Sequence, residues 1–258
     1  MLREIQKEWR YGLRNGRFLI LLAGFLFFAM LTPVMMKYVV PGVMQAQMPG
    51  IAEDTLAQMF HMDQLGCIQS YMGDVLEIGA LMAALTLCGL IAQEIKDHTL
   101  VLPLCGGKKL VHILSAKFLV FAAALIVILT GALSVDYLYA GLLYRFDIGY
   151  ASIVSSGLMQ GLFMVFLLAN LLFFGAVIKK PVAAGLVTLG ILYAMSALGG
   201  LLKIGSWLPT GLMDAALKLQ AVPSPEALKT ACITVGLILL LLGAALLQLK
   251  RMEWNQRG

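Results

Sequence analysis

Charged residues are scarce in this chain. Aspartate, glutamate, lysine and arginine make up only 13% of its 258 residues, whereas a soluble domain carries about 25%. Hydrophobic residues account for 60%, and the mean hydropathy is +0.89. This balance excludes an ordinary soluble domain, and no solvated basic face suited to nucleic acid is visible. We therefore expect an all-α polytopic membrane protein.

Signatures of common enzymes and metal sites are missing as well. The nearest approach to a Walker A motif, CGGKKL, has lysine where a hydroxyl residue must follow and lacks the earlier glycine. No HExxH or GxSxG motif occurs, and the four cysteines have neither CxxC nor ligand spacing. We expect a chain that is not an enzyme, with no catalytic residues, no metal site and no cofactor of its own.

Six segments are apolar over roughly the 20 residues that a helix needs to cross a bilayer. A charged segment precedes the first of them, which argues against a cleaved signal peptide. The predicted organisation is an interfacial helix at 1–17 and a six-span transmembrane domain at 18–258. The expected spans lie at about 18–34 (reaching as far as 40), 75–93, 118–139, 153–178, 182–202 and 231–249.

The N-terminal segment has an apolar face. Leu2, Ile5, Trp9 and Leu13 follow helical spacing, and basic residues fall on the other side. This pattern is typical of a helix lying in the membrane interface. The alternative is a solvated basic leader that only sets the topology.

The basic residues are distributed unevenly between the two sides of the membrane. Most of the 19 lysines and arginines fall in the N-terminal segment, between the second and third spans, after the fourth span and in the C-terminal tail. Because cytoplasmic segments are enriched in lysine and arginine, we expect both termini to be cytoplasmic. The predicted location is the cytoplasmic membrane of a bacterium.

Two longer segments are predicted outside, at about 39–74 and 203–230. The first contains Met59, His61 and Met62, whose thioether and imidazole groups suit Cu(I). Packing of methionines at the membrane boundary explains the same residues without a metal. In the second, Thr210 is a candidate cap for a short helix at 211–219 whose apolar side faces the membrane.

Polar residues within the spans are few. Asp74 and Glu77 open the second predicted span, Asp136 closes the third, and Gln160 and Asn170 lie in the fourth. They either line the outer mouth of a substrate route or are interfacial groups that water reaches.

The segment at about 94–117 is the most unusual connection. A connector between two spans needs two to eight residues, but this one is about three times longer and mixes charges with an apolar run. Pro103 and the Gly106–Gly107 pair favour a turn within it. A polar hairpin with an apolar face is a plausible docking surface for a soluble partner, and the alternative is a protruding helix pair without such a role.

The hairpin resembles that of the permease subunits of type-2 ATP-binding-cassette exporters. In those permeases an acid, a Gly-Thr pair, an apolar run, a Pro-x-Ser-Arg motif and a closing lysine follow the second span. The matching positions here are Glu94, Thr99, the run Leu100, Val101, Leu102 and Leu104, and Lys117. The departures are His98 for glycine, Gly107 for proline, an early Pro103, and Lys108 and Lys109 in place of the arginine.

The resemblance implies an exporter permease that forms its substrate route as a dimer, with a second copy or a homologous permease. A separate ATPase subunit would hold ATP and magnesium and would dock on the hairpin. The implied coupling residues are Glu94, Asp97, Thr99, Leu100 and Lys117, and the candidate route residues are Asp74, Glu77, Gln160 and Asn170. An ion-coupled secondary carrier and a non-transporting assembly factor are the alternatives.

Overall fold

The computed structural model describes residues 2–47, 63–202 and 205–252, and within these ranges it contains helices and no strand. Six helical stretches among them are long and apolar enough to cross a membrane, so the predicted all-α, six-span fold is confirmed. The stretches are Arg17–Val43, Gln64–Lys96, Leu110–Leu143, Tyr150–Ile178, Pro181–Leu202 and Pro225–Arg251. The Met59, His61 and Met62 cluster lies outside the described residues.

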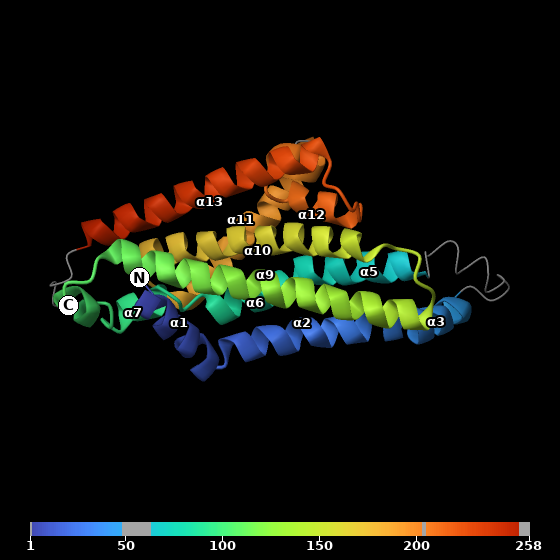
Figure 1. The fold of residues 1–258 in the computed structure, drawn as a ribbon. Helices are drawn as coiled ribbons and strands as arrows, with labels where there is room; N and C mark the ends of the chain where they lie inside the picture. Colours follow the sequence, from blue (N-terminus) through green and yellow to red (C-terminus); the bar gives the residue numbers. More distant parts are fainter. Residues whose placement is uncertain (1, 48–62, 203–204, 253–258) are drawn as a thin grey trace.

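The helices form an elongated bundle (Figure 1). The N-terminal helix, α7, the start of α9 and the end of α13 share one end, and α3, the start of α5 and the end of α9 share the other. The elements are α1 (Leu2–Arg14), α2 (Arg17–Val34), a π-helical segment (Met35–Val39), α3 (Val40–Gln47), α5 (Gln64–Asp74), a second π-helical segment (Val75–Gly79), α6 (Ala80–Leu87), α7 (Ala92–Lys96), α8 (Val101–Cys105), α9 (Leu110–Leu143), α10 (Tyr150–Ile178), α11 (Pro181–Leu202), a 3-10 turn (Gly205–Trp207), α12 (Gly211–Leu217) and α13 (Pro225–Arg251).

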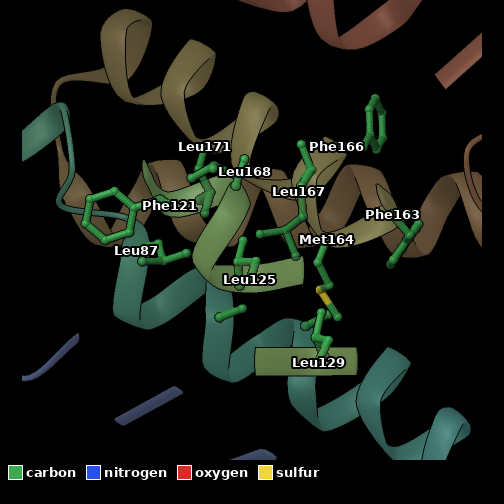
Figure 2. Close-up of a cluster of buried hydrophobic side chains, with 14 of the residues drawn as sticks. Leu87, Phe121, Leu125, Leu129, Phe163, Met164, Phe166, Leu167, Leu168 and Leu171 are labelled. Carbon is green, nitrogen blue, oxygen red and sulfur yellow. The ribbon is translucent and has the colours of Figure 1, made fainter. Parts of the chain in front are cut away.

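Helix α10 is the centre of the bundle. It packs against α9, α11, α12 and α13, and most of its apolar length is buried. Figure 2 shows the place where Leu87 of α6 and Leu125 of α9 meet Leu168 of α10. Small residues bring α9 and α10 together: a Cβ added at Gly157 would lie 3.1 Å from the Cα of Thr130. This close approach is typical of helix contacts in membranes.

The helix that contains the second predicted span begins earlier than that span. Residues 64–74 are helical, and the Asp63 side chain caps this helix by accepting a hydrogen bond of 2.7 Å from the Gly66 amide. Their polar groups are satisfied inside the protein, as when the Gln69 side chain donates to the Leu217 carbonyl at 3.0 Å. Because helix also extends to residue 47, the predicted outer segment 39–74 is helical at both ends.

The second outer segment also differs from expectation. Helix α12 buries Leu212 and Ala216 against the bundle and packs on α10, so its apolar side does not face the membrane. Thr210 makes no side-chain cap. Ser224 instead caps α13, accepting a hydrogen bond of 3.2 Å from the Ala227 amide, with Pro225 in the first turn. The segment predicted at 203–230 therefore ends at residue 224, because proline is well suited to the first turn of a helix.

Candidate functional site

Helix α1 has three chemically different faces. Glu4, Glu8 and Gly12 recur every four residues and are buried against the bundle. Leu2, Trp9 and Leu13, three of the four residues of the predicted apolar face, form a second, exposed face, whereas Ile5 is partly buried against the core. The third face is exposed and basic, and it carries Arg3, Lys7, Arg10 and Arg14.

The buried acidic face of α1 holds a lysine of α9. The Nζ atom of Lys117 donates to Glu8 Oε2 at 2.8 Å and to Glu94 Oε1 at 2.7 Å, and only 1% of Lys117 is exposed. Glu94 belongs to α7, so one ammonium group joins α1, α7 and α9. The Tyr11 ring of α1 lies 5.6 Å from the same Nζ atom and adds a cation–π contact. We call Lys117, Glu8 and Glu94 the ionic cluster.

A second ion pair links α1 to the residues just before α9, with its acid one turn from Glu8. Lys108, just before α9, donates to Glu4 of α1. Glu4 is buried, and the hydrogen bond from Lys108 lowers the pKa of its carboxyl group against the opposing effect of burial. Glu4 and Glu8 are four residues apart, so they lie on one side of the helix. Together the two contacts fix α1 along the base of the hairpin.

Buried ion pairs of this kind position elements more than they stabilise a fold. Removing the charges from water costs several kcal/mol per ion, and the mutual attraction roughly repays it. Removing only one partner of such a pair destabilises the fold strongly, because it leaves an uncompensated buried charge. The ionic cluster therefore favours one register of α1 against α7 and α9 over its alternatives.

Aromatic packing closes the same junction from the lipid side. Phe18 of α2 lies 5.3 Å from the Trp9 ring and 5.1 Å from the Phe121 ring, measured between centroids. Gly12 allows α1 to cover Phe18, because a Cβ there would lie 2.5 Å from the Phe18 ring. Gly16 forms the elbow between α1 and α2 with a φ of 68°, which glycine adopts without strain.

The predicted coupling residues divide into two groups. Glu94 and Lys117 meet in the ionic cluster, and Lys117 is thus two turns inside α9 rather than at the end of an exposed loop. Leu100 is 4% exposed and belongs to the hydrophobic core, so it holds the hairpin and is not free to dock. Asp97 and Thr99 are exposed.

Local hydrogen bonds shape the exposed turn. The Thr99 amide and hydroxyl donate to the Glu94 carbonyl at 3.0 and 3.3 Å, and Asp97 Oδ2 accepts from the Gln93 side chain at 2.7 Å. His98 has a φ of 54°, in the left-handed region that glycine adopts most readily. Gly107 has a φ of 77°, which proline cannot adopt. The departure at His98 is therefore compatible with a glycine in the resembled pattern, whereas the departure at Gly107 is not compatible with a proline.

The candidate route residues do not gather at one place. Asp74 and Glu77 lie about 15 and 20 Å along the helix from its start at Gln64, so they belong to a continuous helical stretch rather than to its first turn. Asp74 accepts a hydrogen bond of 3.0 Å from the Thr32 hydroxyl, whereas Glu77 is exposed on the flank of the bundle. Both border or lie in the π-helical segment Val75–Gly79, a type of distortion that is frequent at functional sites.

Gln160, Asn170 and Asp136 are buried. Gln160 donates to the Met72 carbonyl at 3.4 Å, and Asn170 donates to the Phe166 carbonyl of its own helix at 2.9 Å. Asp136 is 0% exposed, and neither of its oxygens has a hydrogen-bond partner among the residues that the structure describes. The expectation that water reaches this acid from outside is therefore wrong.

Three functional candidates were missed by sequence reasoning. Glu4 and Glu8 were hidden within a basic segment, although their four-residue spacing was a usable signal. Gln64 is fully buried and accepts from the Asp147 and Ile148 amides at 2.8 and 3.3 Å, so it fixes the turn between α9 and α10. No local pattern marks that role, since its partners are more than 80 residues away.

Comparison of the sequence with models of known protein families finds no match, and comparison with curated protein sequences finds none either. The structure itself defines a multi-pass, helical membrane protein, and its candidate site is the hairpin anchored by the ionic cluster.

Proposed function

We propose that the chain is the membrane-spanning permease subunit of an ATP-binding-cassette exporter. In this proposal the 94–117 hairpin faces the cytoplasm and docks on a separate ATPase, which binds ATP and magnesium. Two permease copies, or this chain and a homologous permease, form the substrate route. The location is then a cytoplasmic membrane, as the distribution of basic residues suggests.

The observation that carries the proposal is the way in which the hairpin is anchored. The ionic cluster holds the two ends of the hairpin to each other and to α1, and the Glu4–Lys108 pair holds its middle to α1, while the core holds Leu100. Between these anchors the chain presents a short exposed stretch that includes Lys96, Asp97, His98 and Thr99. A firmly held base with an exposed polar tip is suited to receive a push from a partner and to transmit it to α9.

The mechanism follows from this arrangement. Lys117 joins three helices, so movement of the docked hairpin is transmitted to α1, α7 and α9 together. Closing of the ATPases on nucleotide would then shift a two-state equilibrium of the bundle, to the extent that the docked partner prefers one of the states.

The dimer seam is proposed on the flank formed by the second and fifth spans. Glu77 is exposed there, and its carbonyl accepts a hydrogen bond of 2.6 Å from the Tyr193 hydroxyl of α11. An ionisable side chain within a span is costly in lipid and usually faces a partner or water. This supports a second permease, and a hydrated route, beside Glu77.

The test is reconstitution with and without the partner ATPase. We expect the affinity-tagged chain to copurify with an ATPase that contains a Walker A motif, and Asp97→Lys to abolish ATP-driven transport at an equal protein level. Asp97→Asn, which keeps the hydrogen-bond acceptor, and Asp147→Lys, in the exposed turn between α9 and α10, are the matched controls. Full coupling in Asp97→Lys would refute the docking role of the hairpin.

One observation favours an ion-coupled secondary carrier as a second candidate. Asp136 is fully buried within α9 and has no cationic partner among the described residues, and Asp74 lies close enough to interact with it electrostatically. A buried acid of this kind is a common proton site in carriers. The discriminating result is transport by the purified chain alone in vesicles with a pH gradient, lost in Asp136→Asn. The exporter proposal predicts no transport without the ATPase.

A further inference from the structure

We propose that the junction of α1, α2 and α9 binds an anionic phospholipid, with one acyl chain in an apolar groove and the phosphate on the basic face of α1. This inference concerns the surface of α1 opposite to the ionic cluster and does not depend on the transport function. It is based on two hollows that lie over neighbouring faces of α1.

The first hollow is an apolar groove of about 480 Å³. Trp9 and Leu13 of α1 form one wall, Phe18 and Leu22 of α2 another, and Ala123 and Val127 of α9 the third. Along α9 the lining runs from residue 123 to 128, which is about 8 Å. The groove therefore accommodates the part of an acyl chain nearest to its headgroup.

The second hollow, of about 630 Å³, lies over the basic face of α1 and is lined by Arg3, Lys7, Arg10 and Arg14 among others. Lys7 lies 3.8 Å from Glu8, but Arg10 and Arg14 form no ion pair with any residue in the described part of the chain. Their guanidinium groups are thus available to a phosphate, which they match with paired hydrogen bonds.

Neighbouring residues of α1 line the two hollows. Arg10 directly follows Trp9 and Arg14 directly follows Leu13, so each arginine lies about 100° around the helix from an apolar residue of the groove. Trp9 is 48% exposed, and tryptophan is enriched at the depth of the headgroups. A molecule that fits both hollows has an apolar chain beside a negative phosphate, which is the chemistry of an anionic phospholipid.

Charge decides between this occupant and a zwitterionic lipid. A choline headgroup would bring its own cation among the arginines, whereas a glycerol headgroup would not. Each basic residue near an anionic membrane surface contributes about a five-fold preference. Two arginines should therefore select phosphatidylglycerol clearly over phosphatidylcholine, and the preference should weaken with salt.

Tryptophan fluorescence provides the test. Trp207→Phe and Trp254→Phe leave Trp9 as the sole tryptophan of the full chain. The protein is reconstituted in phosphatidylcholine vesicles that contain a small, equal fraction of either brominated phosphatidylglycerol or brominated phosphatidylcholine. We expect the brominated phosphatidylglycerol to quench Trp9 with an apparent association at least about five-fold stronger.

Three variants separate the parts of the site. Arg10→Gln with Arg14→Gln should bring the ratio close to one, and Lys179→Gln with Lys180→Gln, an exposed basic pair between α10 and α11, should leave it unchanged. Ala123→Phe, which fills the groove from an exposed position, should reduce quenching by both lipids. Excess inorganic phosphate should not relieve the quenching, because the acyl chain contributes to binding.

Equal quenching by the two brominated lipids, or none by either, would overturn the proposal. A preference that survives in the double arginine variant would place the site elsewhere and would overturn it too. Size-exclusion profiles and circular dichroism that match the parent protein establish that each variant is folded.

Discussion

Replacing Lys117 by methionine is the most informative perturbation of this structure. Methionine has a similar length and no charge, so it fills the space of the lysine stem within α9. Glu8 and Glu94 then face each other across the former site with no cation between them. The side chains of Glu8 and Glu94 are only 2% and 16% exposed, so water replaces the lost partner poorly.

The size of the effect follows from that burial. Breaking a buried ion pair by removing one partner costs about 3–5 kcal/mol. In a chain of about this size 1 kcal/mol lowers the melting temperature by about 2–4 °C. The Lys117→Met variant should therefore melt roughly 6–20 °C below the parent protein. Adding Glu8→Gln and Glu94→Gln removes the orphaned charges and should recover most of that loss, because uncharged replacement of a whole buried cluster is often nearly neutral.

The assay is thermal melting in detergent followed by size-exclusion chromatography with fluorescence detection. Lys109→Met is the matched control, since Lys109 is an exposed residue of the same hairpin. Its replacement should change the free energy of unfolding by no more than about 0.5 kcal/mol. A Lys117→Met protein as stable as the parent would refute the account of the ionic cluster. A triple variant no more stable than Lys117→Met would show that repulsion between the carboxylates is not the cause.

Three further outcomes are expected. The hydrogen bond from Lys108 lowers the pKa of Glu4 below its ordinary value of 4.5, so it contributes stability above that pH. This contribution disappears as the pH falls through the pKa of the folded state. Glu4→Gln should therefore flatten the fall in melting temperature between pH 6 and pH 3. Gly157→Leu should destabilise the protein by at least about 1–3 kcal/mol through a clash with the backbone of α9, whereas Gly131→Leu, with open space around it, should not. Gln64→Leu leaves buried polar groups unpaired and should cost about 1–3 kcal/mol, with faster hydrogen exchange at the Asp147 amide as the specific readout.

The six spans and the apolar face of α1 could be predicted because each depends on a local run or a local spacing. The ends of the spans could not. Residues 64–74 look polar in sequence, yet Gln64 and Gln69 find partners on α9, α12 and the turn before α10. A hydropathy scale scores each residue as if it were isolated in lipid. It therefore ends a predicted helix too early wherever the polar groups are satisfied by other helices.

The candidate hairpin shows the same limit. Its length and its mixed composition identified it, and two of the residues singled out there, Glu94 and Lys117, form an ion pair in the structure. Their partner Glu8 was not, because it lies 109 residues before Lys117 along the chain. Leu100 was named only as a residue of the coupling hairpin, and its burial in the core could not be read from the sequence.

The amino-acid sequence determined that this chain is a six-helix membrane protein, because the free energy of burying 20 apolar residues in lipid depends on composition and length alone. Tertiary structure decided which charges became structural. A buried lysine requires carboxylates within about 3 Å, and only the meeting of α1, α7 and α9 brings Glu8, Glu94 and Lys117 to that distance.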